Sequence, residues 1–164
     1  MTKDRTLVTA GRVDVRLLPK GPHGRALCRW CRRECPKAMQ TFCGPECVHD
    51  HRVRSDPGYA RACVLARDQG VCAVCRVDTL AVQADLLQRK PKERKLLAAK
   101  LGYPYPRIRK GTLWEMDHIR PVAHGGGSCG LDNLQTLCCR CHVRKSAAQA
   151  VTRARARTGV RPTP

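Results

Sequence analysis

The alternation of apolar and polar residues predicts a hairpin in the second half of the chain. The run TLWEMDHI at 112–119 can form one strand and LDNLQTL at 131–137 can form the other. The segment GGGS at 125–128 lies between them and is typical of a flexible loop. A last helix, from about Cys139 to Val151, is expected to lie against this hairpin.

Two helices are predicted upstream from the residues that begin and end them. A short helix begins at Pro45 and runs to about Arg54, because proline suits the first helical position. Asp56 can cap the next helix, which begins at Pro57 and ends where Gly70 can adopt the left-handed conformation. The apolar face of this second helix is predicted to comprise Tyr59, Ala62, Cys63 and Ala66.

Residues 78–101 are predicted to form two short helices that are interrupted at Pro91. The candidates for their buried positions are Leu86, Leu87, Leu96, Leu97 and Leu101. The run YPYP at 103–106 then excludes a helix. Weak alternation in residues 1–27 predicts a hairpin or a poorly ordered arm, and the Arg-rich segment after Thr152 is expected to be disordered.

Composition limits the core that this chain can build. Its 164 residues include two Trp, three Tyr and one Phe, so we expect a source of stability besides apolar packing. Twelve cysteines can provide it, either as disulfides or as metal ligands. The N-terminal stretch carries charges where a signal peptide needs an apolar run, and no stretch approaches the ~20 apolar residues of a membrane span. We therefore expect an intracellular protein, cytoplasmic or (in a eukaryote) nuclear, whose reduced cysteines hold zinc.

Cysteine spacing predicts a zinc site that joins two distant segments. Cys72-x-x-Cys75 and Cys138-x-x-Cys141 each have the spacing of a knuckle that supplies two thiolates to tetrahedral zinc. Cys139 competes with Cys138, but its spacing to Cys141 is poorer, so we leave it out. Zinc here would tie the start of the last helix to the segment that precedes the helical insertion.

A second zinc site is predicted nearer the N-terminus. Cys28-x-x-Cys31 and Cys43-x-x-x-Cys47 offer four more thiolates. Both sites would be closed by four thiolates, which indicates a structural and not a hydrolytic role. The residues that could replace one of these ligands are Cys35, His49 and His51. Of the other cysteines, Cys63 is expected in the core, and no role is predicted for Cys129.

The charge is strongly positive and implies a polyanionic partner. Lys and Arg total 32 against 13 Asp and Glu, which gives a formal net charge of +19. After Asp132 there are seven basic residues and no acidic one. A solvated Arg-rich surface in a protein of biased composition is the alternative interpretation. Nucleic acid is the partner that we expect.

Four polar residues stand at a defined spacing across the predicted hairpin and last helix: Asp117, His118, Asn133 and His142. The stretch WEMDHIRPVAHGGGSCGLDNLQTLCCRCHVRKSA at 114–147 resembles the HNH or ββα-metal endonuclease family and matches its signature at each of these positions. Upstream, TFCGPEC, VRSDPGYAR and RDQGVCAVC resemble the segment before the HNH motif in the annealing-helicase endonucleases of vertebrates. The resemblance covers about residues 28–147 and includes no helicase part, so we expect a nuclease module alone.

The resemblance implies a metal-dependent endonuclease that hydrolyses DNA. Asp117 would supply an oxygen and His142 a nitrogen to one divalent ion, Mg²⁺ or Mn²⁺, which leaves coordination positions for phosphate and water. His118 is the expected general base, since imidazole exchanges protons near neutral pH. In the family, the amide that corresponds to Asn133 fixes the loop and orients the base, and the products carry 5′-phosphate and 3′-hydroxyl ends.

In the family the catalytic helix enters the minor groove beside the scissile phosphate. Arg144 and Lys145 occupy the positions just past the second histidine, and Arg120 lies next to the base, so these three are expected to contact DNA phosphates. Such contacts carry no base identity. The helical insertion at 78–111, rich in Lys and Arg, is either the source of a substrate preference or a solvated charged face.

Several alternatives stay open at the level of sequence. His124 is a solvated loop residue or a further ligand, and Glu115 lies on the strand face of Asp117 and could reach the metal. The chain could instead be a non-catalytic zinc module that binds nucleic acid, an enzyme that acts on RNA, or a cysteine-rich redox or metal-buffer protein. Oligomeric state and DNA sequence preference are not predicted.

Together these features predict an α+β fold, in which a treble-clef-like zinc finger and a helix precede a small zinc-stapled domain with a ββα-metal motif. The expected boundaries are an N-terminal arm at 1–27, a zinc-finger segment at 28–55, a nuclease domain at 56–151 that contains the helical insertion at 78–111, and a basic tail at 152–164.

Overall fold

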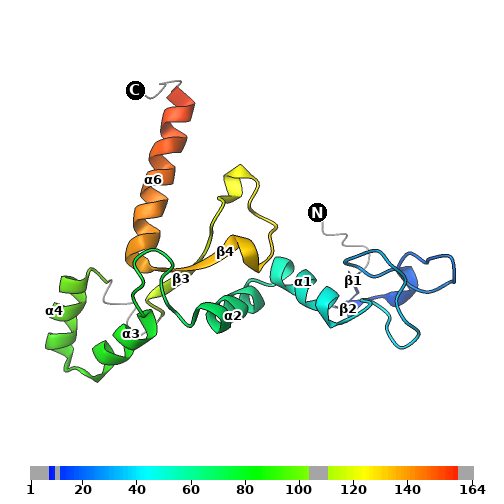
Figure 1. Cartoon of the computed structure of the whole chain (residues 1–164), viewed down its shortest axis with the longest axis horizontal. Coiled ribbons are helices and arrows are strands. Elements are labelled where there is room, and N and C mark those ends of the chain that lie inside the picture. Colours follow the sequence, from blue (N-terminus) through cyan, green and yellow to red (C-terminus); the bar gives the residue numbers. More distant parts are fainter. Residues whose placement is uncertain (1–7, 10–11, 104–110, 159–164) are drawn as a thin grey trace. The chain divides into compact units, whose positions relative to one another are not determined.

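The computed structural model describes residues 8–9, 12–103 and 111–158. The chain divides into two compact units, Met1–Ala60 and Arg61–Pro164, and the boundary falls inside a helix (Figure 1).

The first unit contains a small hairpin and one helix. Strands β1, Val8–Thr9, and β2, Arg12–Val13, pair antiparallel, and a 3-10 turn, Val15–Leu17, follows. This confirms the weak hairpin that the sequence predicts. The helix α1 spans Pro45–Ser55, with proline at its start as expected. The buried core of the first unit comprises Cys28, Cys35 and Cys47, with Trp30, Cys31, Phe42 and Cys43 packed against them.

Helix α2, Pro57–Asp68, begins at the predicted cap, because Asp56 Oδ1 accepts a hydrogen bond from the Tyr59 backbone N at 3.0 Å. Its buried face differs from the prediction. Ala60 and Val64 are 2% and 0% exposed, and the predicted Ala62 and Ala66 are exposed. Val64 is larger than either alanine, so burial of the helix face that carries Val64 removes more apolar area from water than burial of the face that carries Ala62 and Ala66.

Helices α3, Thr79–Gln88, and α4, Pro91–Leu101, form the predicted pair in the second unit. Asp78 caps α3 by accepting hydrogen bonds from the backbone N atoms of the first turn, both at 2.9 Å. Gly102 ends α4 in the left-handed conformation, with φ of 72°.

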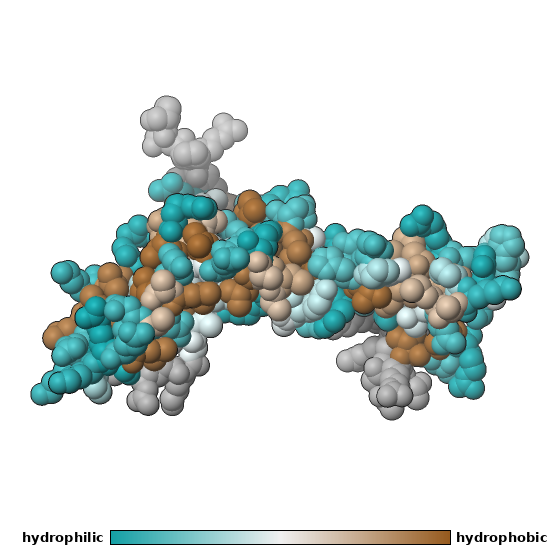
Figure 2. Space-filling view, turned by 60° about the horizontal axis from the view of Figure 1, so that its bottom comes forward, coloured by the Kyte–Doolittle hydropathy of each residue, from teal (hydrophilic) through white to brown (hydrophobic). Residues whose placement is uncertain are grey.

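Only some of the predicted leucines in these helices are buried. Leu86 is fully buried, and Leu97 and Leu101 pack against the core of the second unit. Leu87 and Leu96 are 44% and 73% exposed, so their predicted burial is wrong. Each short helix buries a single stripe, and residues adjacent to that stripe stay at the surface. Hydrophobic residues accordingly interrupt the hydrophilic surface (Figure 2).

The predicted hairpin is formed by β3, Trp114–His118, and β4, Leu134–Cys138. The strands are antiparallel, with Trp114 opposite Cys138 and His118 opposite Leu134. Residues 131–133, predicted as the start of the second strand, instead form a 3-10 turn, Leu131–Asn133. Asn133 therefore lies just before β4 and not on it.

Helix α6, Cys139–Thr158, follows β4 directly and packs against both strands. It continues past Val151, so the prediction of disorder after Thr152 is wrong for residues 152–158. The segment from Cys139 to Thr158 contains neither glycine nor proline and is rich in Ala and Arg, which favour helix. Residues 159–164 lie outside the described part of the chain.

The core of the second unit combines apolar side chains with cysteines. Its fully or nearly buried members include Cys72, Leu86, Ala98, Tyr103, Leu113, Leu137, Cys138, Cys139 and Cys141. The predicted α+β class is confirmed: helices are combined with a small sheet in each unit, and each core contains a cysteine group. In the part of the chain that the structure describes, no helix has both the length and the apolar character of a membrane span.

Replacement of Leu137, which is 0% exposed, tests the importance of this core. We expect Leu137→Ala to lower the free energy of unfolding by about 3 kcal/mol, because it leaves a cavity under the hairpin. Leu96→Ala, at a position 73% exposed, should change it by less than about 0.5 kcal/mol. Denaturant unfolding of both variants measures the difference, and equal losses would contradict this account of the core.

Candidate functional site: a carboxylate and imidazoles around one cavity

Asp117 lies near the end of β3, with its carboxylate held from two sides. Gln135, directly opposite on β4, donates to Asp117 Oδ2 at 3.0 Å. Lys145 on α6 donates its ammonium to the same oxygen and to the backbone O of His118. The side chains of Asp117 and Lys145 are 15% and 24% exposed. The carboxylate is therefore half-buried and is already in contact with a cationic group.

His118, the last residue of β3, opens with Asp117 onto a cavity of about 310 Å³. The loop 121–124 forms one side of the cavity, and residues on the later turns of α6 form another. His124 belongs to that loop, so the structure places it on the cavity wall with the other two residues. The predicted general base is thus half-buried and accessible from a space large enough for part of a substrate.

His142 lies in the first turn of α6 and is half-buried. Lys145 and Gln149 follow it at spacings of three and seven residues, so the three share one side of the helix. Lys145 reaches Asp117, and Gln149 lines the cavity. Among the described residues, Asp117 and His142 do not belong to any group of three or more converging metal ligands.

Asn133 fixes the loop that follows β3. Its Oδ1 accepts a hydrogen bond from the Arg120 backbone N at 2.7 Å, and its Nδ2 donates to Arg120 O and Gly126 O at 3.1 and 3.0 Å. A Cβ at Gly126 would lie 1.9 Å from Arg120 O and 2.8 Å from Asn133 Nδ2. The middle glycine of the GGG run is therefore required by close packing of backbone and amide.

Two neighbouring residues of α2 hold this turn from the other side, and sequence reasoning missed them. Arg67 donates to Leu131 O at 2.6 Å and to Leu134 O at 2.7 Å, on either side of Asn133. Asp68 accepts from the Thr136 backbone N at 3.0 Å and pairs with Arg67, which lowers the pKa of its carboxyl. The only signal was the RDQG run, which carries no spacing rule of its own.

The three basic residues expected at DNA have different surroundings. Arg144 is exposed on α6. The Arg120 guanidinium donates to Gly125 O at 2.9 Å, although the residue remains exposed. Lys145 is engaged with Asp117 and the adjacent backbone. Arg144 and Arg120 thus present charge at the surface, and Lys145 contributes its charge inside the site.

Glu115, considered as a further ligand, pairs with Arg61 at 3.6 Å. Arg61 also donates to Thr112 Oγ1 and Trp114 O, and its guanidinium lies 3.8 Å from the centre of the Trp114 ring. This arrangement assigns Glu115 to the junction between α2 and β3.

The structure brings together the four cysteines that the spacing groups in the second unit. The sulfur atoms of Cys72, Cys75, Cys138 and Cys141 lie within 4.8 Å of one another, and Cys75 Sγ is 3.7 Å from Cys138 Sγ. A tetrahedral zinc with four bonds of ~2.3 Å separates its sulfurs by about 3.8 Å. A disulfide would need ~2.05 Å. The four cysteines could therefore hold a metal ion.

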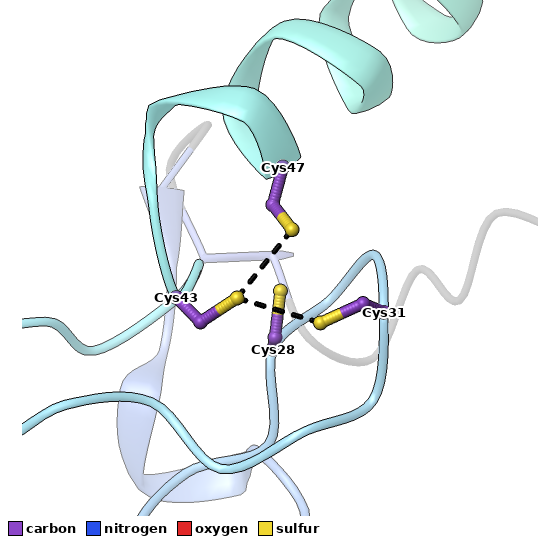
Figure 3. Close-up of side chains that lie close together, drawn as sticks. All are labelled: Cys28, Cys31, Cys43 and Cys47. Atoms are coloured by element: carbon purple, nitrogen blue, oxygen red, sulfur yellow. Dashed lines mark hydrogen bonds between the residues drawn. The ribbon is translucent and has the colours of Figure 1, made fainter.

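The corresponding group in the first unit comprises Cys28, Cys31, Cys43 and Cys47, whose sulfurs converge from a loop and the first turn of α1 (Figure 3). Cys43 Sγ lies 3.4 Å from both Cys31 Sγ and Cys47 Sγ. The group includes neither His49, whose ring hydrogen-bonds to Tyr59, nor His51, whose ring packs on Phe42. Cys35 is buried beside the group but is not part of it.

The thiols of the two groups differ in acidity. The Arg33 side chain lowers the pKa of the Cys31 thiol to about 6. Burial raises the pKa of the Cys72 thiol, but backbone N–H groups, chiefly that of Cys75, outweigh it and lower the pKa to about 7. The neighbouring Cys43 thiol raises the pKa of Cys47, and burial raises that of Cys141. Full ionisation of either group thus needs a cation among the sulfurs.

The remaining cysteines lie outside both groups. Cys139 is buried in the core, and its backbone N donates to Leu113 O at 2.9 Å. Cys63 on α2 and Cys129 near the glycine loop are half-buried. Neither belongs to a described cluster of metal ligands.

Comparison with known proteins places this geometry in a family. Residues 106–148 match the family described as HNH endonuclease. The mouse protein "DNA annealing helicase and endonuclease ZRANB3" is 37% identical over 155 residues, and the human protein of that name is 35% identical over 153. Each alignment covers 82% of this chain and 14% of the relative, so this chain spans about a seventh of the length of either relative.

A solved structure agrees with these sequence matches. The crystal structure of the human ZRANB3 HNH domain superimposes with a TM-score of 0.53 at 35% identity, and covers 63% of this chain and 97% of that domain. The match includes nearly the whole of a solved HNH domain, and the residues matched by the family include β3, the turn before β4, β4 and the first turns of α6. The chain belongs to the HNH endonuclease family and carries a nuclease domain.

Proposed function

We propose that this chain hydrolyses phosphodiester bonds of DNA, with His118 as the general base and one divalent ion held by Asp117 and His142. The observation that carries the proposal is that His118 and Asp117 line the same cavity. An imidazole that can take a proton from water and a carboxylate that attracts a cation then face the same substrate space.

The residues present fit a divalent ion. Asp117 offers a hard anionic carboxylate, of which Oδ2 accepts from Gln135 and Lys145 and Oδ1 is the oxygen proposed for the ion. His142 offers an imidazole on the side of α6 that faces the hairpin. Mg²⁺ and Mn²⁺ suit this donor pair, and such an ion would supply positive charge to the phosphate and to the departing sugar oxygen.

His118 would remove a proton from the water that attacks phosphorus. Its position depends on the backbone immediately after β3, because the Arg120 N and O atoms are held by Asn133 and Ile119 N donates to Asn133 O at 2.8 Å. Asn133 therefore acts as a positioning residue for the base. Lys145, next to the same carboxylate, would help to balance the charge of an incoming phosphate.

DNA is the proposed substrate because the named relatives are DNA-processing enzymes and the chain carries a net charge of +19. Arg120 and Arg144 would contact phosphates, so affinity should fall with rising salt. The proposal concerns the nuclease step alone, since the chain spans 14% of those relatives. Two four-thiol groups suit structural zinc and a reducing intracellular compartment.

Replacement of the general base tests this function. We expect His118→Ala to slow nicking of supercoiled plasmid in Mg²⁺ or Mn²⁺ by about 100- to 10,000-fold, because general-base catalysis contributes that much. DNA binding should be retained. His23→Ala, which alters a histidine paired with Glu34 in the first unit, is the matched control and should cut normally. A wild-type protein that binds DNA and never nicks it would favour a non-catalytic binding module.

The glycine loop offers a second test, directed at Asn133. Gly126→Ala should reduce the cleavage rate by about 100-fold, because the new Cβ would displace the Arg120 carbonyl and with it the backbone next to His118. Gly127→Ala is the control, since its Cβ would meet only the Val122 side chain at 3.1 Å. Plasmid cleavage and thermal unfolding are measured for both. Equal activity of the two variants would argue against a positioning role for the loop.

Metal content tests the cysteine groups. We expect native mass spectrometry to find two zinc ions per chain, and one ion after Cys72→Ser or Cys31→Ser. Loss of the ion at Cys72 should also abolish cleavage, because structural zinc contributes about 10 kcal/mol or more to the folding of such sites. Cys63→Ser, outside both groups, should keep two ions. Retention of both ions by Cys72→Ser would refute the assignment.

A further inference from the structure

The cavity beside His118 extends well beyond the signature residues. Besides Asp117, His118 and the loop 121–124, its walls include Ala148, Gln149, Thr152 and Arg153 of α6. Its volume of about 310 Å³ exceeds what a water molecule or a metal ion needs. Figure 1 shows α6 continuing beyond the hairpin. The lining residues between 148 and 153 belong to this continuation.

The side of α6 that carries His142 runs on into this wall. Gln149 and Arg153 follow His142 at spacings of seven and eleven residues, which return to nearly the same side of a helix of 3.6 residues per turn. Arg153 lies eight residues beyond Lys145, or about 12 Å along the axis. Side chains of a helix lean toward its N-terminus, so the Arg153 guanidinium can lie closer to Lys145 than this rise. Asp117 and Arg153 line one cavity, which suits neighbouring phosphates of one strand.

The cavity wall has the chemistry of a nucleotide subsite. Val122 is 60% exposed, and with Ala148 it offers an apolar surface against which a deoxyribose can pack. The Arg153 Nε donates to Gln149 O at 3.3 Å, which directs the planar guanidinium from a fixed point on the helix. A guanidinium fork matches a phosphate better than any other side chain does. Among the described lining residues, Asp117 is the one carboxylate.

We propose that this cavity binds the nucleotide next to the scissile phosphate, with its sugar on Val122 and Ala148 and its phosphate on Arg153. The inference rests on the proposed nuclease function and adds a substrate contact outside the family signature. Arg153 is a binding residue here. It contributes to DNA affinity through contact with one particular phosphate, beyond the general attraction between DNA and a basic protein.

Binding measurements separate a specific contact from general charge. His118→Ala keeps the DNA intact, so affinity for a short labelled duplex is measured in that background with Mg²⁺ present. Adding Arg153→Gln should weaken binding by about tenfold, the loss expected for one charge-assisted hydrogen bond. Arg155→Gln removes the same charge about 200° around the helix and should weaken binding much less. Equal losses for the two variants would overturn the proposal.

A chemical change in the DNA then identifies the contact. In a series of duplexes, a single phosphate at a time is replaced by an uncharged methylphosphonate. One such linkage, beside the cleaved bond, should weaken binding about tenfold with Arg153 present and have little effect after Arg153→Gln. If each methylphosphonate weakens DNA binding equally with and without Arg153→Gln, Arg153 makes no defined phosphate contact and the proposal fails.

The same series keeps this inference distinct from the nuclease proposal. The cleaved bond is mapped with the wild-type protein on the unmodified duplex. If the wild-type protein cuts DNA and the two variants Arg153→Gln and Arg155→Gln lose equal DNA affinity, the nuclease function stands and the subsite is refuted. A wild-type protein that never cuts refutes the nuclease function, and a phosphate that depends on Arg153 but lies beside no cleaved bond overturns the subsite as stated.

Discussion

Four sulfur atoms converge at the point where β4 becomes helix, and a metal ion held among them would fix the placement of α6 on the hairpin. Cys138 ends the strand and Cys141 lies in the first turn of the helix, so the two sulfurs span the junction. Cys72 and Cys75 meet them from a segment whose backbone is also tied to β4, through Ala73 N and Thr136 O at 2.8 Å. A helix held at its first turn has a defined direction along its length, and this direction determines which of its side chains reach Asp117.

The opposite end of β4 is held by a different kind of interaction. Arg67 and Asp68 bind the backbone on both sides of Asn133, and Asn133 in turn binds the backbone before the glycine loop, at Arg120, and within it, at Gly126. All of these bonds end on main-chain atoms, so they determine backbone position irrespective of most side chains. A metal ion among the sulfur atoms would thus position the helix, and polar side chains position the loop beside His118. Asp117 and His118, the proposed reacting groups, lie on the strand that pairs with β4 between these two constraints.

The hairpin and the helices could be predicted because their signals are local. Proline and capping aspartate mark the starts of α1, α2 and α3, and alternation marks β3. The two cysteine groups could be predicted because a four-sulfur site restricts the spacing within each pair. These features require no knowledge of which distant segments meet.

The features that the sequence did not predict all depend on contacts between segments that are distant in the sequence. Ala60 and Val64 are buried because other segments of the fold pack on that face of α2. The sequence of α2 alone does not indicate which face those segments cover. Arg67 lies more than sixty residues from the carbonyls that it binds, so it resembles any surface arginine in the sequence. Arg153 was assigned to a disordered tail, since a basic segment without an apolar face carries no sign of the cavity beside it. A charged residue gains a role from the partner that the fold brings to it, and composition alone cannot supply that partner.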